Sequence, residues 1–170
     1  MGNFTTTVLV TQIDRKKPDK YTLVFDEGPS DDPTYSILKT WGKDTLIIGS
    51  IGGDQKIVFP GNGFIYTKTR MNRLCTSYKK YILKDDYIKE VKQPFYYEGT
   101  ESEALENITI YFDKEFTKPV ANLPKGSPVT VLLYDKGYFL LKTPFGLTGW
   151  YKLKKSYPKS ELKYIQFAGD

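Results

Sequence analysis

The chain contains no histidine and only one cysteine, and these shortages exclude many kinds of active site. Without histidine there is no Ser-His-Asp or Cys-His arrangement for nucleophilic catalysis, and no metal or haem site with imidazole ligands. A single cysteine, Cys75, permits neither an internal disulfide nor a cysteine-based metal cluster. We interpret Cys75 as a small apolar residue in a strand, because such cysteines are usually buried, and a reactive thiol is the alternative. The sequence therefore predicts a protein that is not an enzyme and holds no cofactor or metal.

Long hydrophobic runs are missing as well. No apolar stretch approaches the roughly 20 residues of a membrane-spanning helix, so we do not expect an integral membrane protein. The first residues, MGNFTTTVLVTQIDRKK, have no basic region ahead of their short apolar patch and do not read as an export signal. If such a signal precedes them in the gene, we expect a periplasmic or envelope-associated protein, and otherwise a cytoplasmic one.

Excess positive charge is confined to the last part of the chain. Residues 1–106 carry 15 lysines and arginines against 15 acidic residues, whereas residues 107–170 carry 10 lysines against 5 acids and no arginine. Because bidentate recognition of phosphate and guanine favours arginine, the sequence does not predict specific nucleic-acid binding. Attraction to an acidic protein or another anionic polymer stays open, beside the simpler interpretation of solubilising surface lysines.

The chain does have the residue pattern of β-strands from end to end. Short alternating or β-branched runs between turn residues predict a mainly β protein, in which an N-terminal β-meander or sandwich-like domain precedes a small closed barrel. We predict the domains at residues 1–103 and 104–170, with the boundary between about Gly99 and Asn107, where the segment TESEALEN is polar and acidic. Any helix there is confined to SEALE, which is about one turn.

Within the first domain the clearest signals are hairpins. The turn segments GGDQ and PGNG separate short apolar runs, and we expect strands over Thr5–Ile13, Tyr21–Phe25, Thr45–Ile51, Lys56–Phe59 and Phe64–Thr69. The segment Tyr78–Val91 has Lys84, Asp85 and Asp86 at its middle and favours a further hairpin, with a short helix as the alternative.

Two clusters of charged residues have the composition of a site. An acidic loop could suggest calcium, but its spacing matches no ordered calcium loop and prolines interrupt it, so we interpret it as solvated; its carboxylates are Asp26, Glu27, Asp31 and Asp32. The segment RMNRLCTSYKK suggests a surface for an anion or a single strand of nucleic acid, or an ordinary solvated face. It places Arg70, Arg73, Lys79 and Lys80 near Tyr66, Tyr78 and Tyr81.

The last third of the chain carries a family resemblance. It contains a turn Leu123-Pro124-Lys125-Gly126, a second turn at Asp135-Lys136-Gly137, and a hairpin that ends in Gly-x-x-Gly-Trp at Gly146 to Trp150. From Ile108 onward, over about 45 residues, the sequence resembles a bacterial SH3 domain, which implies an SH3-like barrel at 104–170 with a C-terminal extension. In that extension Leu162, Tyr164, Ile165 and Phe167 predict a last strand or turn that packs back, either to close the barrel or to dock onto the N-terminal part.

The segments FPGNGFIY and EVKQPFYYEG are also similar to uncharacterised bacterial envelope proteins with a β-rich N-terminal region. The chain departs from those proteins before IVFPGNG, where SIGGDQK replaces an expected acidic loop.

Aromatic residues near the expected loops of the barrel are the candidate contacts. Bacterial SH3 domains that bind do so through aromatic residues and loops on one rim, and rigid rings suit extended peptides at low entropy cost. The matching positions here are Tyr111, Phe112, Tyr134, Tyr138, Trp150 and Tyr151. Because side chains alternate along a strand, half of these rings must point inward, and Trp150 is also a candidate for the core.

The resemblance implies a non-catalytic binding module of a bacterial envelope protein. We expect its partner to be a peptide, a protein or a cell-wall fragment such as peptidoglycan. The alternative is an inhibitor or immunity-type protein that neutralises a toxin or enzyme by direct binding, which the basic end and the absence of catalytic residues suit equally well.

Overall fold

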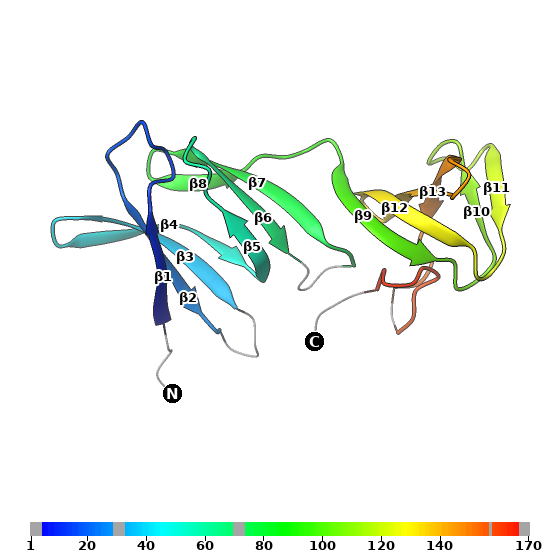
Figure 1. Cartoon of the computed structure of the whole chain (residues 1–170), viewed down its shortest axis with the longest axis horizontal. Helices are drawn as coiled ribbons and strands as arrows, with labels where there is room; N and C mark the ends of the chain where they lie inside the picture. The colour runs from blue at the N-terminus through cyan, green and yellow to red at the C-terminus, as the bar shows by residue number, and fades with distance from the viewer. Residues whose placement is uncertain (1–4, 29–32, 70–73, 157, 167–170) are drawn as a thin grey trace. The chain divides into compact units, whose positions relative to one another are not determined.

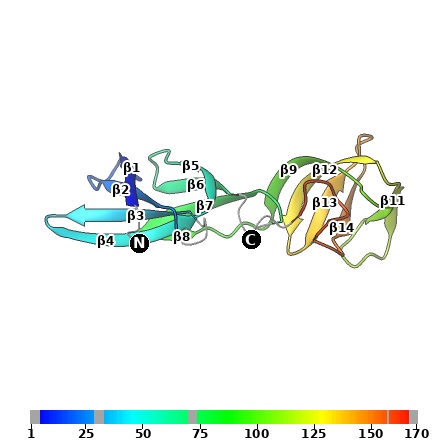
Figure 2. The same ribbon diagram turned by 90° about the horizontal axis from the view of Figure 1, so that it is seen from below.

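The computed structural model describes residues 5–28, 33–69, 74–156 and 158–166, and within these ranges the chain consists of strands and turns without a helix. The predicted mainly β class is therefore confirmed, and the segment SEALE, to which any helix was confined, is not helical. The chain divides into two compact units, one of Met1–Met71 with Tyr78–Lys92, and one of Asn72–Ser77 with Gln93–Asp170. Figure 1 labels their strands apart from β14, which is labelled in Figure 2.

The first unit contains two four-stranded antiparallel sheets, ordered β1-β2-β3-β4 and β5-β6-β7-β8. Their strands are β1 (Thr5–Thr11), β2 (Tyr21–Asp26), β3 (Thr34–Trp41), β4 (Asp44–Gly52), β5 (Asp54–Val58), β6 (Phe64–Thr69), β7 (Ser77–Lys84) and β8 (Tyr87–Glu90). The expected hairpin at 78–91 is confirmed as β7 and β8, and Asp85 takes the left-handed conformation that its tight turn requires. The helical alternative is wrong, because Tyr81, Leu83 and their neighbours pair with β8.

One hydrophobic core serves both sheets of this unit. Ile37 of β3 and Ile51 of β4 are buried in the same cluster as Ile65 of β6. Gly49 of β4 faces β8 so closely that a Cβ atom on it would lie 2.3 Å from Ile88 Cγ1. The absence of a side chain at Gly49 therefore lets the two strands pack directly against each other.

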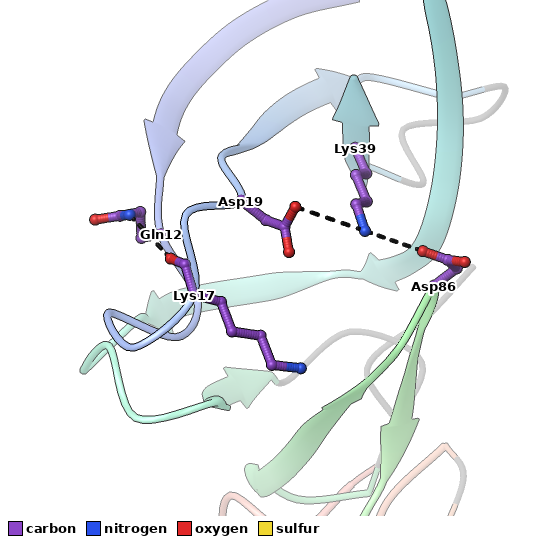
Figure 3. A network of polar contacts seen from close by, with 5 residues as sticks. All are labelled: Gln12, Lys17, Asp19, Lys39 and Asp86. Atoms are coloured by element: carbon purple, nitrogen blue, oxygen red, sulfur yellow. Dashed lines mark hydrogen bonds and ion pairs between the residues drawn. The ribbon is translucent and has the colours of Figure 1, made fainter. Parts of the chain in front are cut away.

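A lysine joins three segments of the first unit (Figure 3). The Nζ of Lys39 on β3 lies 3.1 Å from Asp86 Oδ1 in the β7–β8 turn and 3.8 Å from Asp19 Oδ1 ahead of β2. Its hydrogen bond to Asp86 raises the pKa of Lys39. In the same view, Gln12 Nε2 donates a hydrogen bond to the carbonyl oxygen of Lys17.

The second unit is built on one six-stranded antiparallel sheet, ordered β11-β10-β14-β13-β12-β9. Its strands are β9 (Tyr96–Glu103), β10 (Ile108–Tyr111), β11 (Pro119–Leu123), β12 (Pro128–Asp135), β13 (Tyr138–Lys142) and β14 (Thr148–Lys152). Strands β14, β13, β12 and β9 follow one another across the unit (Figure 2). The fully buried side chains of Ile110, Val131 and Phe139 belong to one core cluster, so one face of the sheet folds around its own core.

Two expectations about this unit need correction. The predicted boundary at 103/104 leaves residues 96–103 in the first domain, but these residues form β9, which pairs with β12 from Pro128↔Glu103 to Tyr134↔Tyr96. The predicted barrel is closed, whereas the sheet is open in the described part of the chain, with β9 and β11 as its edges. The two corrections have one cause, because β9 occupies the edge of β12 that closure of the barrel would use.

The C-terminal tail packs back as expected, but within its own unit. Leu162 and Ile165 are buried in the second core, and Leu162 bridges Ala104, whereas Tyr164 is exposed. Phe167 lies outside the described residues. Cys75 is buried in the same core, as predicted, although it lies in a bend before β7 and not in a strand.

Candidate binding surface on the second unit

The outer face of the second sheet carries a continuous row of large side chains. On β14 the neighbours Gly149 and Tyr151 are buried, so alternation turns Trp150 outward. The strand registers align Trp150 with one residue of each neighbouring strand. This outer row crosses all six strands as Tyr97, Leu133, Leu140, Trp150, Tyr111 and Pro119.

The loop between β10 and β11 lays a second group of rings on this face. Phe116 adopts a left-handed backbone conformation, and its ring lies 5.0 Å from the ring of Tyr111 and 6.0 Å from that of Tyr138. Phe95, ahead of β9, lies 6.4 Å from Trp150. These five rings form what we call the aromatic cluster, within the distances at which aromatic pairs attract one another.

The loop is held in this position by its own hydrogen bonds. The carboxylate of Asp113 accepts hydrogen bonds from the backbone N–H and the hydroxyl of Thr117. The hydrogen bond from the Thr117 hydroxyl has the largest effect and lowers the pKa of Asp113, and the bond from the Thr117 N–H acts in the same direction. Both favour the ionised carboxylate. The loop therefore presents Phe116 from a braced backbone.

Lys114 is the charged centre of the aromatic cluster. Its Nζ lies 4.2 Å from the ring centroid of Trp150, and 5.6 and 5.7 Å from those of Tyr138 and Phe95. The same ammonium group forms an ion pair with Asp135, next to the β12–β13 turn. Contacts of a cation with ring faces stabilise by about 0.5–2 kcal/mol, depending on how far water is excluded. Lys114 thus connects the β10–β11 loop to the β12–β13 turn above Trp150.

A groove of about 540 Å³ adjoins the aromatic cluster. Tyr111 and Phe116 belong to both, and Lys152, whose Nζ lies 5.3 Å from the Tyr138 ring, also lines the groove. The other lining residues come from the start of β10 and the end of β14, and they are Asn107, Ile108, Thr109, Tyr151, Leu153 and Lys154. The volume is within the range of pockets that hold small ligands or short peptide segments.

The structure separates the six residues expected to make contacts. Tyr111, Tyr138 and Trp150 meet in the aromatic cluster. Phe112 is 71% exposed beside the cluster, with Lys118 Nζ 5.9 Å from its ring.

The last two of the six lie on the core side of the sheet. Tyr134 packs against Phe139 of the core. Tyr151 is itself in the core, where burial raises the pKa of its phenol and the carboxylates of Glu161 and Glu106 act in the same direction. Tyr151 is therefore a neutral core residue whose edge reaches the groove.

Three members of the surface were missed from the sequence: Phe95, Lys114 and Phe116. All three lie in loops, where the two-residue alternation of a strand does not apply and the direction of a side chain cannot be read. Phe95 also precedes a strand that had been assigned to the other domain. The one available signal was the density of aromatic residues in KQPFYY and IYFDKEF.

Three described members of the two charged clusters, Lys79, Lys80 and Asp26, make local contacts. Lys79 Nζ lies 2.8 Å from Glu90 Oε2, and Lys80 Nζ lies 3.9 Å from the ring of Phe64. Asp26 accepts a hydrogen bond from the N–H of Gly28. Four other charged members of the two clusters, Arg70, Arg73, Asp31 and Asp32, lie outside the described residues.

In the described ranges, no group of three or more cysteines and carboxylates is placed to hold a metal ion. No helix long and apolar enough to cross a membrane occurs there either. Comparisons of the chain with protein-family models, with curated proteins and with solved structures find no match.

Proposed function

We propose that this protein is a non-catalytic binding module that recognises a peptide or a protein partner through the outer face of its second unit. The observation that carries the proposal is Trp150, one of the five rings of the aromatic cluster, which is turned outward on β14 and lies beneath Lys114. Tryptophan and tyrosine are among the residues that most often dominate binding energy at interfaces.

We further interpret this unit as SH3-like, on the sequence resemblance and on two structural features that support it. Strands β12, β13 and β14 form a meander, and β10 lies beside β14. The loop after β10 and the turn after β12 flank the aromatic cluster, and loops flank the contact rim in SH3-like binders too. A cell-wall fragment is the second ligand class that the resemblance suggests.

The two tryptophans of the chain supply a matched test. Trp41 belongs to the first unit and is 49% exposed, whereas Trp150 lies in the aromatic cluster. In a Trp41→Phe background, fluorescence reports on Trp150 alone during titration with a library of linear peptides or with soluble muropeptides. The two alanine variants are made in the wild-type chain and their affinities are measured by calorimetry, which needs no tryptophan signal. We expect Trp150→Ala to weaken binding about 30-fold, which corresponds to a hot spot of about 2 kcal/mol, while Trp41→Ala leaves it unchanged.

NMR provides the outcome that would contradict the proposal. Ligands should shift the signals of Tyr138, Trp150 and Phe116. Shifts confined to residues of the first unit, or equal losses of affinity in both alanine variants, would refute binding through this surface.

An inhibitor or immunity-type role is favoured by the excess of lysine in residues 107–170. Such a protein would hold one folded acidic protein in a tight complex, with steering by long-range attraction. Two results together would distinguish this role from the first. The protein would bind a purified acidic enzyme or toxin and abolish its activity at equimolar amounts, and it would not bind peptides or muropeptides.

A further inference from the structure

Strands β10 and β14 are neighbours in the sheet, yet the ladder between them in the described structure consists of one residue pair, Tyr111 with Trp150. The same antiparallel register, continued along both strands, would pair Thr109 with Lys152 and then Asn107 with Lys154. Those four residues line the groove instead. On their other edges β10 pairs with β11 and β14 pairs with β13 over their whole lengths. Both strands therefore direct a second, open hydrogen-bonding edge toward the groove.

The far end of this opening is held together by side chains. Lys155 Nζ lies 3.6 Å from Glu106 Oε1, and these two residues occupy the next position of the same register. Glu161 of the tail links both sides, because its carbonyl oxygen accepts from the N–H of Leu105 at 2.8 Å and its Oε2 accepts from the N–H of Lys154 at 3.3 Å. The groove is thus a bounded gap between two diverging strands. It is about three to four residues long, or roughly 10–13 Å at the rise of a strand.

The chemistry of the lining indicates which kind of chain fits. Ile108 and Leu153 supply apolar surface, and Lys152 and Lys154 supply positive charge. None of the residues that line the groove is acidic. Because a strand needs hydrogen-bond partners for its backbone and pockets for alternate side chains, an extended peptide with acidic side chains complements this lining.

We propose that the groove between β10 and β14 binds an extended acidic peptide, which docks as an additional β-strand along the open edges of these two strands. This inference rests on the proposed function, since it names the class of partner and the way in which the second unit holds it. Main-chain hydrogen bonds to Thr109 and its neighbours supply affinity, and Lys152 and Lys154 select the acidic side chains.

A set of short capped peptides tests the proposal on the full chain. The probe is an octapeptide of alternating glutamate and valine, and its charge control alternates lysine and valine. Two further versions of the probe carry N-methyl groups on all odd or on all even residues, which removes the backbone donors from one side of the strand at a time. We expect the glutamate peptide to shift the backbone amide signals of Thr109, Lys152 and Leu153, and the lysine peptide to bind at least about tenfold more weakly. At least one N-methylated version should lose binding.

Charge-reversal variants provide the matched control on the protein. Lys152→Glu with Lys154→Glu should weaken binding of the glutamate peptide about tenfold, since each exposed ion pair contributes a modest amount. Lys142→Glu with Lys159→Glu changes net charge equally at exposed positions outside the groove and should leave affinity within about twofold. Thermal unfolding and amide spectra of both variants confirm that the fold is retained.

Three results would overturn the inference. If both N-methylated peptides bind as well as the parent, the peptide does not dock as a strand. If the two double variants lose affinity equally, the groove does not select acidic side chains. A glutamate peptide that leaves the groove unshifted, while other ligands still depend on Trp150, refutes this inference alone. If no ligand loses affinity in the Trp150→Ala variant, the proposed function itself is refuted.

Discussion

Tyr151 should make the second unit sensitive to alkaline pH. Its side chain is 5% exposed, and burial raises the pKa of its phenol above the value of 10.0 that an exposed tyrosine has. Above pH 10 the unfolded chain loses the Tyr151 proton, whereas the folded chain keeps it. The stabilisation is therefore fully present below pH 10 and is lost as pH rises toward the folded pKa.

The size of the effect follows from linkage. The free energy of unfolding falls by up to about 1.4 kcal/mol for each pH unit above 10, which gives a loss of about 2 kcal/mol by pH 11.5. The variant Tyr151→Phe has no proton to lose, so its stability should not show this component. The prediction concerns the difference between wild type and variant, because other groups that titrate in this range contribute equally to both.

Urea unfolding measures this difference. In a Trp41→Phe background the fluorescence of Trp150 reports on the second unit alone, and unfolding curves at pH 8 and pH 11.5 give the two free energies. The advantage of wild type over Tyr151→Phe should decrease by about 2 kcal/mol between these pH values. A difference that stays constant with pH would show that Tyr151 ionises as readily in the folded protein as in the unfolded chain, and would refute the reasoning.

Four other changes have defined outcomes. Gly149→Ala should destabilise the second unit by about 1–3 kcal/mol in urea unfolding, because the new Cβ would lie 2.9 Å from Ile110 Cβ; no change would mean that the two strands separate easily. Phe139→Ala, at a fully buried site, should cost about 3–5 kcal/mol by the same assay, and a smaller cost would indicate a loosely packed core. Lys39→Met should remove a component of first-unit stability that is present below pH 10.5 and is lost above it, as measured by thermal unfolding against pH; a variant with the wild-type pH profile would contradict this. Lys114→Met should make Trp150 more accessible to acrylamide quenching, and unchanged quenching would show that the loop holds its place without the ion pair.

Strand β9, one of those that the sequence did not predict, shows where local patterns stop being informative. Along β9 the inward positions include Glu98 and Ser102, which are both buried, so the strand lacks the usual alternation of apolar and polar residues. A segment with polar residues at its inward positions has the pattern of a linker, so the sequence does not predict a strand there. Its strand conformation depends on β12, which forms six residue pairs with it. The domain boundary was misplaced for the same reason.

The surface was predictable in part. Tyr111, Tyr138 and Trp150 could be selected because they lie on strands or beside tight turns of a recognisable pattern. The orientation of Tyr134 could not, because β12 shifts register between Val131 and Leu133, and one extra residue reverses the faces of those that follow. Phe95, Lys114 and Phe116 depend on loop conformations, which the alternation of strands does not describe.

The sequence by itself determined that the chain folds into strands, where most of its hairpins turn, and that acid–base and metal chemistry based on histidine is excluded. These properties follow from local sterics and composition, which each short segment carries with it. The tertiary structure decided which strands are neighbours, that the second sheet stays open, and that β10 and β14 separate after one pair. Those outcomes depend on the summed burial of residues far apart in the chain, so no short segment contains them.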